Sequence, residues 1–290
     1  AWEAKHGDEP ITQVIIDATM WDPNDNWDDS WLRKEQYDGY QAEVTALMVD
    51  GDRDDPYSSV SARSDDPVQR AADAFIDALD LDDAPTVSTG TGSGAVLAEV
   101  ASAPLSTLIG YMLMASDNVL AEAMARVVSE NTGLGGGSAS LAQAIPSALT
   151  RYGVPVTDLA IRDGSGLSGL NGVSPQYVAQ LMVKVAAGEN DLAIIRETLP
   201  VAGVSGSLAG RFNGDAAAAH GAVFAKTGWL DNEYSLGGII YALDGTPLTF
   251  AFYAIRDGVG TDYEAGEAAK AALDTLAFRA WTCGNNTSNN

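Results

Sequence analysis

The sequence is poor in positive charge. Against 40 Asp and Glu it has only 16 Lys and Arg, which gives a formal net charge of -24 and an isoelectric point near 4.1. Nucleic-acid binding needs clustered Lys and Arg to displace counterions from phosphate, so we expect no nucleic acid as a partner. The acidic residues form short pairs such as Asp28-Asp29 and Asp82-Asp83, which suit solvated loops on an exported or salt-exposed surface.

Cysteine and histidine are also scarce. Cys283 is the single cysteine, so the chain can form no internal disulfide and no cysteine-rich metal site. It is either a free thiol near the terminus or the partner of a cysteine outside this sequence. His6 and His220 stand apart from any metal-ligand pattern, and we therefore predict no metal and no cofactor.

Long apolar runs are absent. No segment approaches the roughly 20 apolar residues that a membrane-spanning helix needs, so we predict no transmembrane segment in this chain. The sequence has no initial Met and no basic-then-apolar leader, and this lack of targeting information does not indicate a cytoplasmic protein. With 290 residues, 46% of them hydrophobic, the chain can bury the core of one large domain or two smaller ones.

Short elements are expected over residues 1–95. Residues 13–18 and 42–49 have the pattern of strands, and residues 88–94 that of a polar, Gly-rich connection. Asp66 and Pro67 provide a cap and first turn for a helix over residues 68–81.

Longer helices are expected from residue 96 onward, and strands near the end of the chain. The predicted helices cover 104–115, 118–130, 140–152, 175–188 and 261–281. The strand-like runs are 222–226, 234–243 and 247–257. A DG turn at Asp244-Gly245 separates the last two runs, which should therefore be adjacent and antiparallel.

Two polar motifs attract attention, although each also has a structural explanation. Ser116-Asp117-Asn118 lies between two predicted helices, where such residues commonly act as caps. Lys226 precedes Thr227 and Gly228 after an apolar run, and a lysine there usually extends into water. Placed across a cleft, however, the hydroxyl, carboxamide and ammonium could position a peptide carbonyl, relay a proton and attract a carboxylate.

A third motif is the Gly-rich loop Asp163-Gly-Ser165-Gly-Leu-Ser168, which could equally be a simple turn. It is not the G-x-S-x-G elbow of serine hydrolases, because Ser165 follows a single glycine outside any strand-turn-helix context.

Taken in order, four blocks resemble one family. SDNVLAEAMAR, DGSGLSGLNGVSP, LPVAGVSGSLAGRF and AKTGWLDNEYSLGG are similar to the D-alanyl-D-alanine carboxypeptidase/endopeptidase family, the low-molecular-mass class C penicillin-binding proteins, from about residue 10 to 280. The resemblance implies an α/β (α+β) penicillin-binding, serine β-lactamase-like transpeptidase fold, with an antiparallel sheet flanked by helices. Residues 1–95 would be the remainder of an inserted domain and its connection, and residues 96–290 the C-terminal part of the penicillin-binding domain.

The resemblance also implies a reaction and its residues. A serine in an S-x-x-K motif would form an acyl-enzyme with a peptidoglycan stem peptide, and β-lactams would mimic that substrate in an exported enzyme of the cell envelope. The expected catalytic residues are Ser116, which would relay a proton to the leaving amine, Asn118, which would hold the substrate amide, and Lys226, which with Thr227 would face the terminal carboxylate. The expected substrate-binding residues are Thr227, Gly228, Trp229, Leu230, Asp163 and Ser165.

The nucleophile motif of that family is missing from this sequence. The residues three positions before the five lysines are Trp2, Trp31, Leu181, Val223 and Glu267, so S-x-x-K occurs nowhere. We expect the chain to be the C-terminal portion of a longer enzyme and to be inactive alone. The alternative is a non-catalytic peptidoglycan-binding or regulatory protein of the same fold.

Further departures concern specificity. Trp229 stands where most relatives have a small hydroxyl residue, so its bulk and indole N–H would rearrange the carboxylate pocket, and Gly169 replaces a common arginine. Trp31, Tyr37 and Tyr40 resemble an aromatic wall that receives the stem peptide, although they could simply pack a loop. A class A β-lactamase fits less well, because its deacylating glutamate loop has no match. We expect Lys226 to end the strand bordering the cleft, with Ser116 at the opposite wall.

Overall fold

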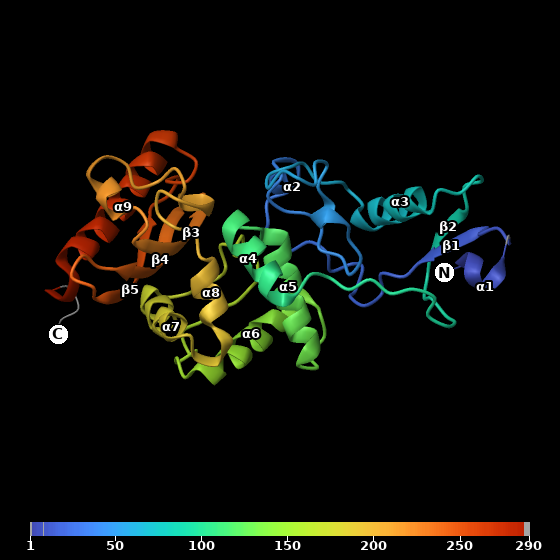
Figure 1. Cartoon of the computed structure of the whole chain (residues 1–290), viewed down its shortest axis with the longest axis horizontal. Coiled ribbons are helices and arrows are strands. Elements are labelled where there is room, and N and C mark those ends of the chain that lie inside the picture. The colour runs from blue at the N-terminus through green and yellow to red at the C-terminus, as the bar shows by residue number, and fades with distance from the viewer. Residues whose placement is uncertain (1, 8, 287–290) are drawn as a thin grey trace. The chain divides into compact units, whose positions relative to one another are not determined.

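The computed structural model describes residues 2–7 and 9–286, which form two compact units. Unit 1 contains the described residues up to Pro104 together with Asn118–Ile145 and Arg162–Ser168. Unit 2 contains Leu105–Asp117, Pro146–Ile161 and the described residues from Gly169 onward. Figure 1 labels the α-helices and strands named below, and each unit is described by itself.

Unit 1 combines short elements with two longer helices, α3 and α5. It contains α1 (Trp2–His6), β1 (Gln13–Ile16), α2 (Lys34–Tyr37), η1 (Asp50–Asp52), α3 (Pro67–Leu79), β2 (Thr86–Thr89) and α5 (Asn118–Asn131). Strands β1 and β2 pair in parallel. As predicted, α3 starts after Asp66, whose side chain accepts a hydrogen bond from the backbone N–H of Gln69 at 2.9 Å.

One expectation for unit 1 is wrong, and another is right only in part. Residues 42–49 form no strand, because their alternating apolar side chains pack without a neighbouring strand: Ala42 and Val44 are buried in a cluster with Trp21 and Trp31. The backbone N–H of Val44 donates to the carbonyl of Asn26 in an irregular loop at 2.8 Å. The expected connection over residues 88–94 begins inside β2, since residues 86–89 pair with β1.

Unit 2 is built around an antiparallel sheet in the order β3-β4-β5, formed by Val223–Leu230, Glu233–Tyr241 and Pro247–Ile255. Its α-helices are α4 (Leu105–Ala115), α7 (Pro175–Ala187), α8 (Ala193–Thr198) and α9 (Tyr263–Cys283), and its short 3-10 helices are η3 (Thr150–Tyr152), η4 (Glu189–Asp191), η5 (Gly206–Leu208), η6 (Gly214–Ala219) and η7 (Gly284–Asn286). Helix α6 (Leu141–Leu149), with η2 (Ser138–Ser140) before it, begins in unit 1 and ends in unit 2. The pairing of β4 with β5 confirms the predicted hairpin.

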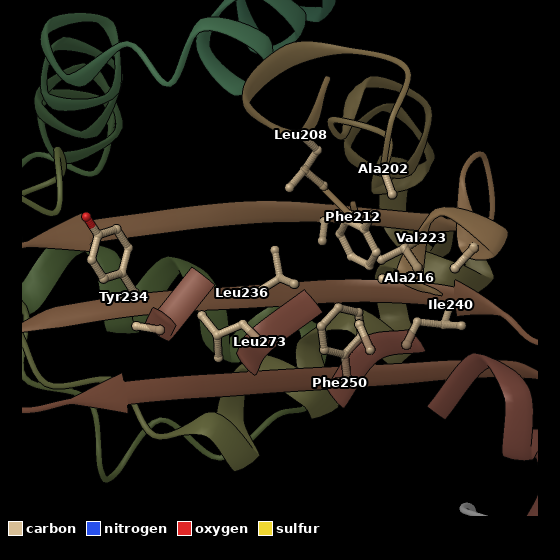
Figure 2. Close-up of a cluster of buried hydrophobic side chains, with 14 of the residues drawn as sticks. Ala202, Leu208, Phe212, Ala216, Val223, Tyr234, Leu236, Ile240, Phe250 and Leu273 are labelled. Carbon is tan, nitrogen blue, oxygen red and sulfur yellow. The ribbon is translucent and has the colours of Figure 1, made fainter. Parts of the chain in front are cut away.

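Helices cover both faces of this sheet. Leu236 and Ile240 of β4 lie in a buried cluster with Leu273 of α9, as Figure 2 shows. The neighbouring residue Ile239 points to the other face, where it packs with Val185 of α7. This alternation follows from the two-residue period of a strand, and it confirms the expected sheet flanked by helices.

Strand β3 is longer than predicted. Residues 227–230 continue the ladder by pairing with residues 233–236 of β4, so Lys226 lies in the middle of the strand and not at its end. Because β3 pairs with β4 on both sides of Lys226, the sheet holds the backbone of this lysine in place.

Within the residues that the structure describes, no helix is both long and apolar enough to cross a membrane. The expected boundary after residue 95 between an inserted and a penicillin-binding domain stays a prediction.

Candidate active site

Unit 2 brings Ser116 and Lys226 into direct contact. Ser116 follows the last residue of α4 and has a left-handed backbone, with φ of 57°. The Lys226 Nζ donates hydrogen bonds to Ser116 Oγ at 2.6 Å and to the carbonyl of Thr227 at 2.8 Å. Two motifs that lie 110 positions apart in the sequence thus share one hydrogen bond.

Burial gives this lysine an unusual acidity. Loss of solvent around the ammonium lowers the pKa of Lys226 from 10.5 to about 8. The side chain is still mostly an ammonium at neutral pH, but it can release its proton close to that pH. Such a group can both attract an anion and take part in a proton relay through the hydroxyl that it contacts.

A residue that the sequence reasoning did not single out, Ser207, lies beside Thr227. The Thr227 Oγ1 donates a hydrogen bond to Ser207 Oγ at 2.8 Å. Ser207 belongs to η5, which is anchored by the fully buried Leu208 and contacts both α4 and β3. The motif LPVAGVSGSLAGRF is visible in the sequence, but it contains Ser205 as well, and only the fold shows which serine meets Thr227.

The residues that follow along β3 are held by their neighbours. An added side chain at Gly228 would meet Ser235 Oγ on β4 and force that hydroxyl to rotate away, so glycine leaves room for the Ser235 hydroxyl. Trp229 is 53% exposed and stacks on Tyr234, and its indole N–H donates to the carbonyl of Gly260 at 3.0 Å. This bond uses the N–H that we expected to replace a small hydroxyl. Leu230 ends the strand.

Unit 1 holds a second group of predicted residues around Asp163, which is only 4% exposed. Its carboxylate accepts hydrogen bonds from Trp31 Nε1 at 2.6 Å, Ser165 Oγ at 3.0 Å and the backbone N–H of Ser168 at 2.8 Å. Gly166 N–H adds a fourth at 2.9 Å. Because Asp163 and Trp31 are buried, their geometry favours holding the loop over touching a substrate, and the predicted contact stays a prediction.

Helix α5 also holds this loop, through a hydrogen bond to the backbone of Gly164. The Glu122 Oε2 accepts a hydrogen bond from Gly164 N–H at 2.6 Å, and Arg126 Nε donates to Glu122 Oε1 at 3.0 Å. Burial raises the pKa of Glu122, although the nearby Arg126 counters that effect. The ion pair fixes the start of the loop, because both of its side chains have no exposed surface.

Asn118 and Tyr40 also meet in unit 1. Asn118 is the first residue of α5, and its Nδ2 donates to the carbonyl of Tyr40 at 3.2 Å. The ring that contacts Trp31 edge-on is Trp27, at 5.3 Å between centroids, which the sequence reasoning missed. Tyr37 is exposed and donates to Asp65 Oδ1 at 3.2 Å.

The predicted site residues therefore form one group in each unit. The group in unit 2 consists of Ser116, Lys226, Thr227, Gly228, Trp229 and Leu230, and the group in unit 1 of Trp31, Tyr40, Asn118, Asp163 and Ser165. Among residues 2–7 and 9–286, no three His, Cys, Asp or Glu side chains are arranged to hold a metal ion. The functional roles of both groups stay predictions.

Solved structures define the class of fold. Penicillin binding protein 4 (dacB) from Haemophilus influenzae matches with a TM-score of 0.75 and 19% identity, over 92% of this chain and 74% of that chain. The same protein complexed with a β-lactam matches with a TM-score of 0.61 and 24% identity, over 75% and 52% of the two chains. The chain thus has the penicillin-binding type of fold that the resemblance implied.

Sequence comparison assigns the chain to a family within this class of fold. It belongs to the D-Ala-D-Ala carboxypeptidase 3 (S13) family, whose sequence profile matches residues 53–280. Carboxypeptidase DacB from Mycolicibacterium smegmatis is 32% identical over 290 aligned residues, which cover 94% of this chain and 59% of the relative. The chain therefore spans somewhat more than half the length of that curated relative.

Proposed function

We propose that the chain forms part of a serine-type D-Ala-D-Ala carboxypeptidase/endopeptidase that acts on peptidoglycan stem peptides through an acyl-enzyme. One observation carries the proposal: the 2.6 Å hydrogen bond between Lys226 Nζ and Ser116 Oγ joins two motifs that the sequence keeps far apart. Membership of the S13 family supports it. The proposal places the working enzyme outside the cytoplasm, at the cell envelope.

In the proposed reaction, this chain supplies the residues that protonate the leaving amine. A serine in an S-x-x-K motif, which these 290 residues lack, gives its proton to the lysine of that motif and attacks the carbonyl of the penultimate D-alanine. As the carbon–nitrogen bond breaks, the Ser116 hydroxyl gives its proton to the leaving amine and regains one from the motif lysine, while the Lys226 ammonium orients the Ser116 hydroxyl through their hydrogen bond. Water then hydrolyses the ester and frees the trimmed peptide. Asn118 holds the substrate amide in this scheme.

The same chain also binds the end of the substrate in this proposal. The Lys226 ammonium and the hydroxyl of Thr227 face the terminal carboxylate, whose charge the partly desolvated lysine attracts more strongly than an exposed one would. A β-lactam carries a carboxylate in the corresponding place and acylates the same serine. The Haemophilus influenzae protein of similar fold is known in complex with a β-lactam, which supports this expectation.

A second candidate function has an observation in its favour. Since none of the five lysines has a serine three positions before it, the chain could serve a protein that binds peptidoglycan without cleaving it. Such a protein would keep the Ser116–Lys226 contact and lack the nucleophile.

The decisive experiment begins with the coding sequence upstream of Ala1. If it encodes S-x-x-K, the longer product should be labelled by fluorescent penicillin, and a variant with alanine at that serine should not. Failure of the unaltered longer product to label would refute the enzyme proposal. An open frame without S-x-x-K, in a protein that still binds peptidoglycan, would favour the second candidate.

The isolated chain provides an independent check. We expect no turnover of a D-Ala-D-Ala peptide by the 290 residues alone, because the proposed nucleophile is not among them. Measurable hydrolysis that disappears in Ser116→Ala would show that the nucleophile has been assigned wrongly.

A further inference from the structure

Ser207 has a hydroxyl beside the Lys226–Thr227 pair, and the proposed reaction gives it no role. It is exposed, and its Oγ lies 2.8 Å from Thr227 Oγ1. Its position is well determined by the surrounding chain. The segment before η5 pairs with β3, with Ala225 N–H donating to the carbonyl of Pro200 at 2.9 Å, so η5 returns to the same edge of the strand.

The local chain fixes which serine reaches the strand. The hydroxyl of Ser205 accepts a hydrogen bond from Val201 N–H at 3.2 Å and so closes its own turn. Gly206 has a left-handed backbone with φ of 57°, and a side chain there would press on Pro200 and the carbonyl of Met114. With Leu208 buried in the core, Ser207 is left on the surface beside Thr227.

The hydroxyl pair of Thr227 and Ser207 has one hydrogen left to donate to a ligand. Thr227 and Ser207 have one hydroxyl hydrogen each, and the bond between them uses the hydrogen of Thr227. The hydrogen of Ser207 is the one left for another acceptor. Because Ser207 already accepts a hydrogen bond, its own O–H is polarised and becomes a better donor.

The donors beside Ser207 indicate which kind of ligand group would bind there. Lys226 supplies a cation next in the chain to Thr227, whereas the Trp229 indole N–H is directed to the carbonyl of Gly260. The ammonium of Lys226 on β3 and the hydroxyl of Ser207, on the η5 turn bonded to the next residue of β3, are the types of donor that a carboxylate accepts with its two oxygens.

We propose that Ser207 is a specificity-determining residue that donates a hydrogen bond to the terminal carboxylate of the ligand, with Thr227 acting behind it. This inference rests on the proposed function and refines it, since Thr227 becomes a positioning residue and the carboxylate contacts Ser207 and Lys226. A ligand whose carboxylate is replaced by a carboxamide loses the charge that makes this bond strong.

The test compares two probes on the 290-residue chain, N-acetyl-D-alanyl-D-alanine and its C-terminal carboxamide, by NMR titration. The unaltered chain should bind the acid more tightly than the amide. Ser207→Ala should reduce this preference about 10-fold, the contribution expected of a hydrogen bond to a charged group. Ser207→Thr keeps the hydroxyl and should retain the preference. Thr227→Val should reduce it less than Ser207→Ala does.

Two other outcomes would contradict the proposal, and they can be told apart. An unchanged preference in Ser207→Ala, or a larger loss in Thr227→Val, refutes the contact with Ser207 and leaves the proposed function standing. If the unaltered chain binds neither probe, the carboxylate site proposed for these residues fails, and the inference fails with it, while the acyl-enzyme proposal is still decided by penicillin labelling of the longer product. Ser205→Ala serves as the matched control from the same loop, because its hydroxyl is bonded to the backbone, and it should leave the preference unchanged.

Discussion

The partly buried ammonium of Lys226 should make the stability of unit 2 depend on pH in a way that its removal abolishes. The perturbation is Lys226→Met, which keeps an unbranched side chain and removes the charge. In the folded protein the pKa of Lys226 is lowered to about 8 by burial, whereas in the unfolded chain it returns to its ordinary value of 10.5. Between these values the unfolded state holds a proton that the folded state has released.

The sign and size of the effect follow from this difference. Because the unfolded state binds more protons in this range, the free energy of unfolding rises with pH. From pH 7.5 to pH 9.5 this one group should raise the free energy of unfolding by about 2 kcal/mol. Well below pH 8 both states are protonated, and the folded state bears the full cost of holding a desolvated ammonium.

The assay is urea unfolding of the unaltered chain and of Lys226→Met at both pH values, followed by tryptophan fluorescence. Trp229 and Trp281 report on unit 2, and because the chain has two units, the two transitions are fitted separately. The stability of the unaltered chain relative to the variant should rise by about 2 kcal/mol from pH 7.5 to 9.5. A difference that stays the same at both pH values would refute the low pKa and the burial argument behind it.

Five further substitutions, grouped in three tests, probe hydrogen bonding, packing and helix capping in the two units. Trp31→Phe removes a donor from a buried carboxylate and should cost about 1–3 kcal/mol in urea unfolding, whereas Trp229→Phe, which loses a more exposed bond, should cost less than about 1 kcal/mol. Gly238→Ala places a methyl group against the β3 backbone and should lower the melting temperature markedly, while Gly210→Ala, with open space around it, should leave it nearly unchanged. Ser174→Ala removes the cap of α7 and should cost about 1 kcal/mol, and an unchanged stability there would contradict the capping assignment.

Local signals in the sequence were enough for most helices and for the hairpin. Ser174 before Pro175 predicted the start of α7, and Asp244-Gly245 predicted the turn between β4 and β5. Each signal depends on residues a few positions apart, so it acts before distant parts of the chain meet. The strand predicted over residues 42–49 failed because alternation alone does not provide a pairing partner.

The sequence by itself also determined the family, because four ordered motifs and a matching profile do not depend on knowing the fold. It determined the absence of S-x-x-K from these residues as well. It could not say that Lys226 is mid-strand, that its ammonium meets Ser116, or that Ser207 and not Ser205 meets Thr227. Only the tertiary structure decided these contacts, since a hydrogen bond between distant segments, and the burial that lowers the pKa of Lys226, exist only once the chain has packed.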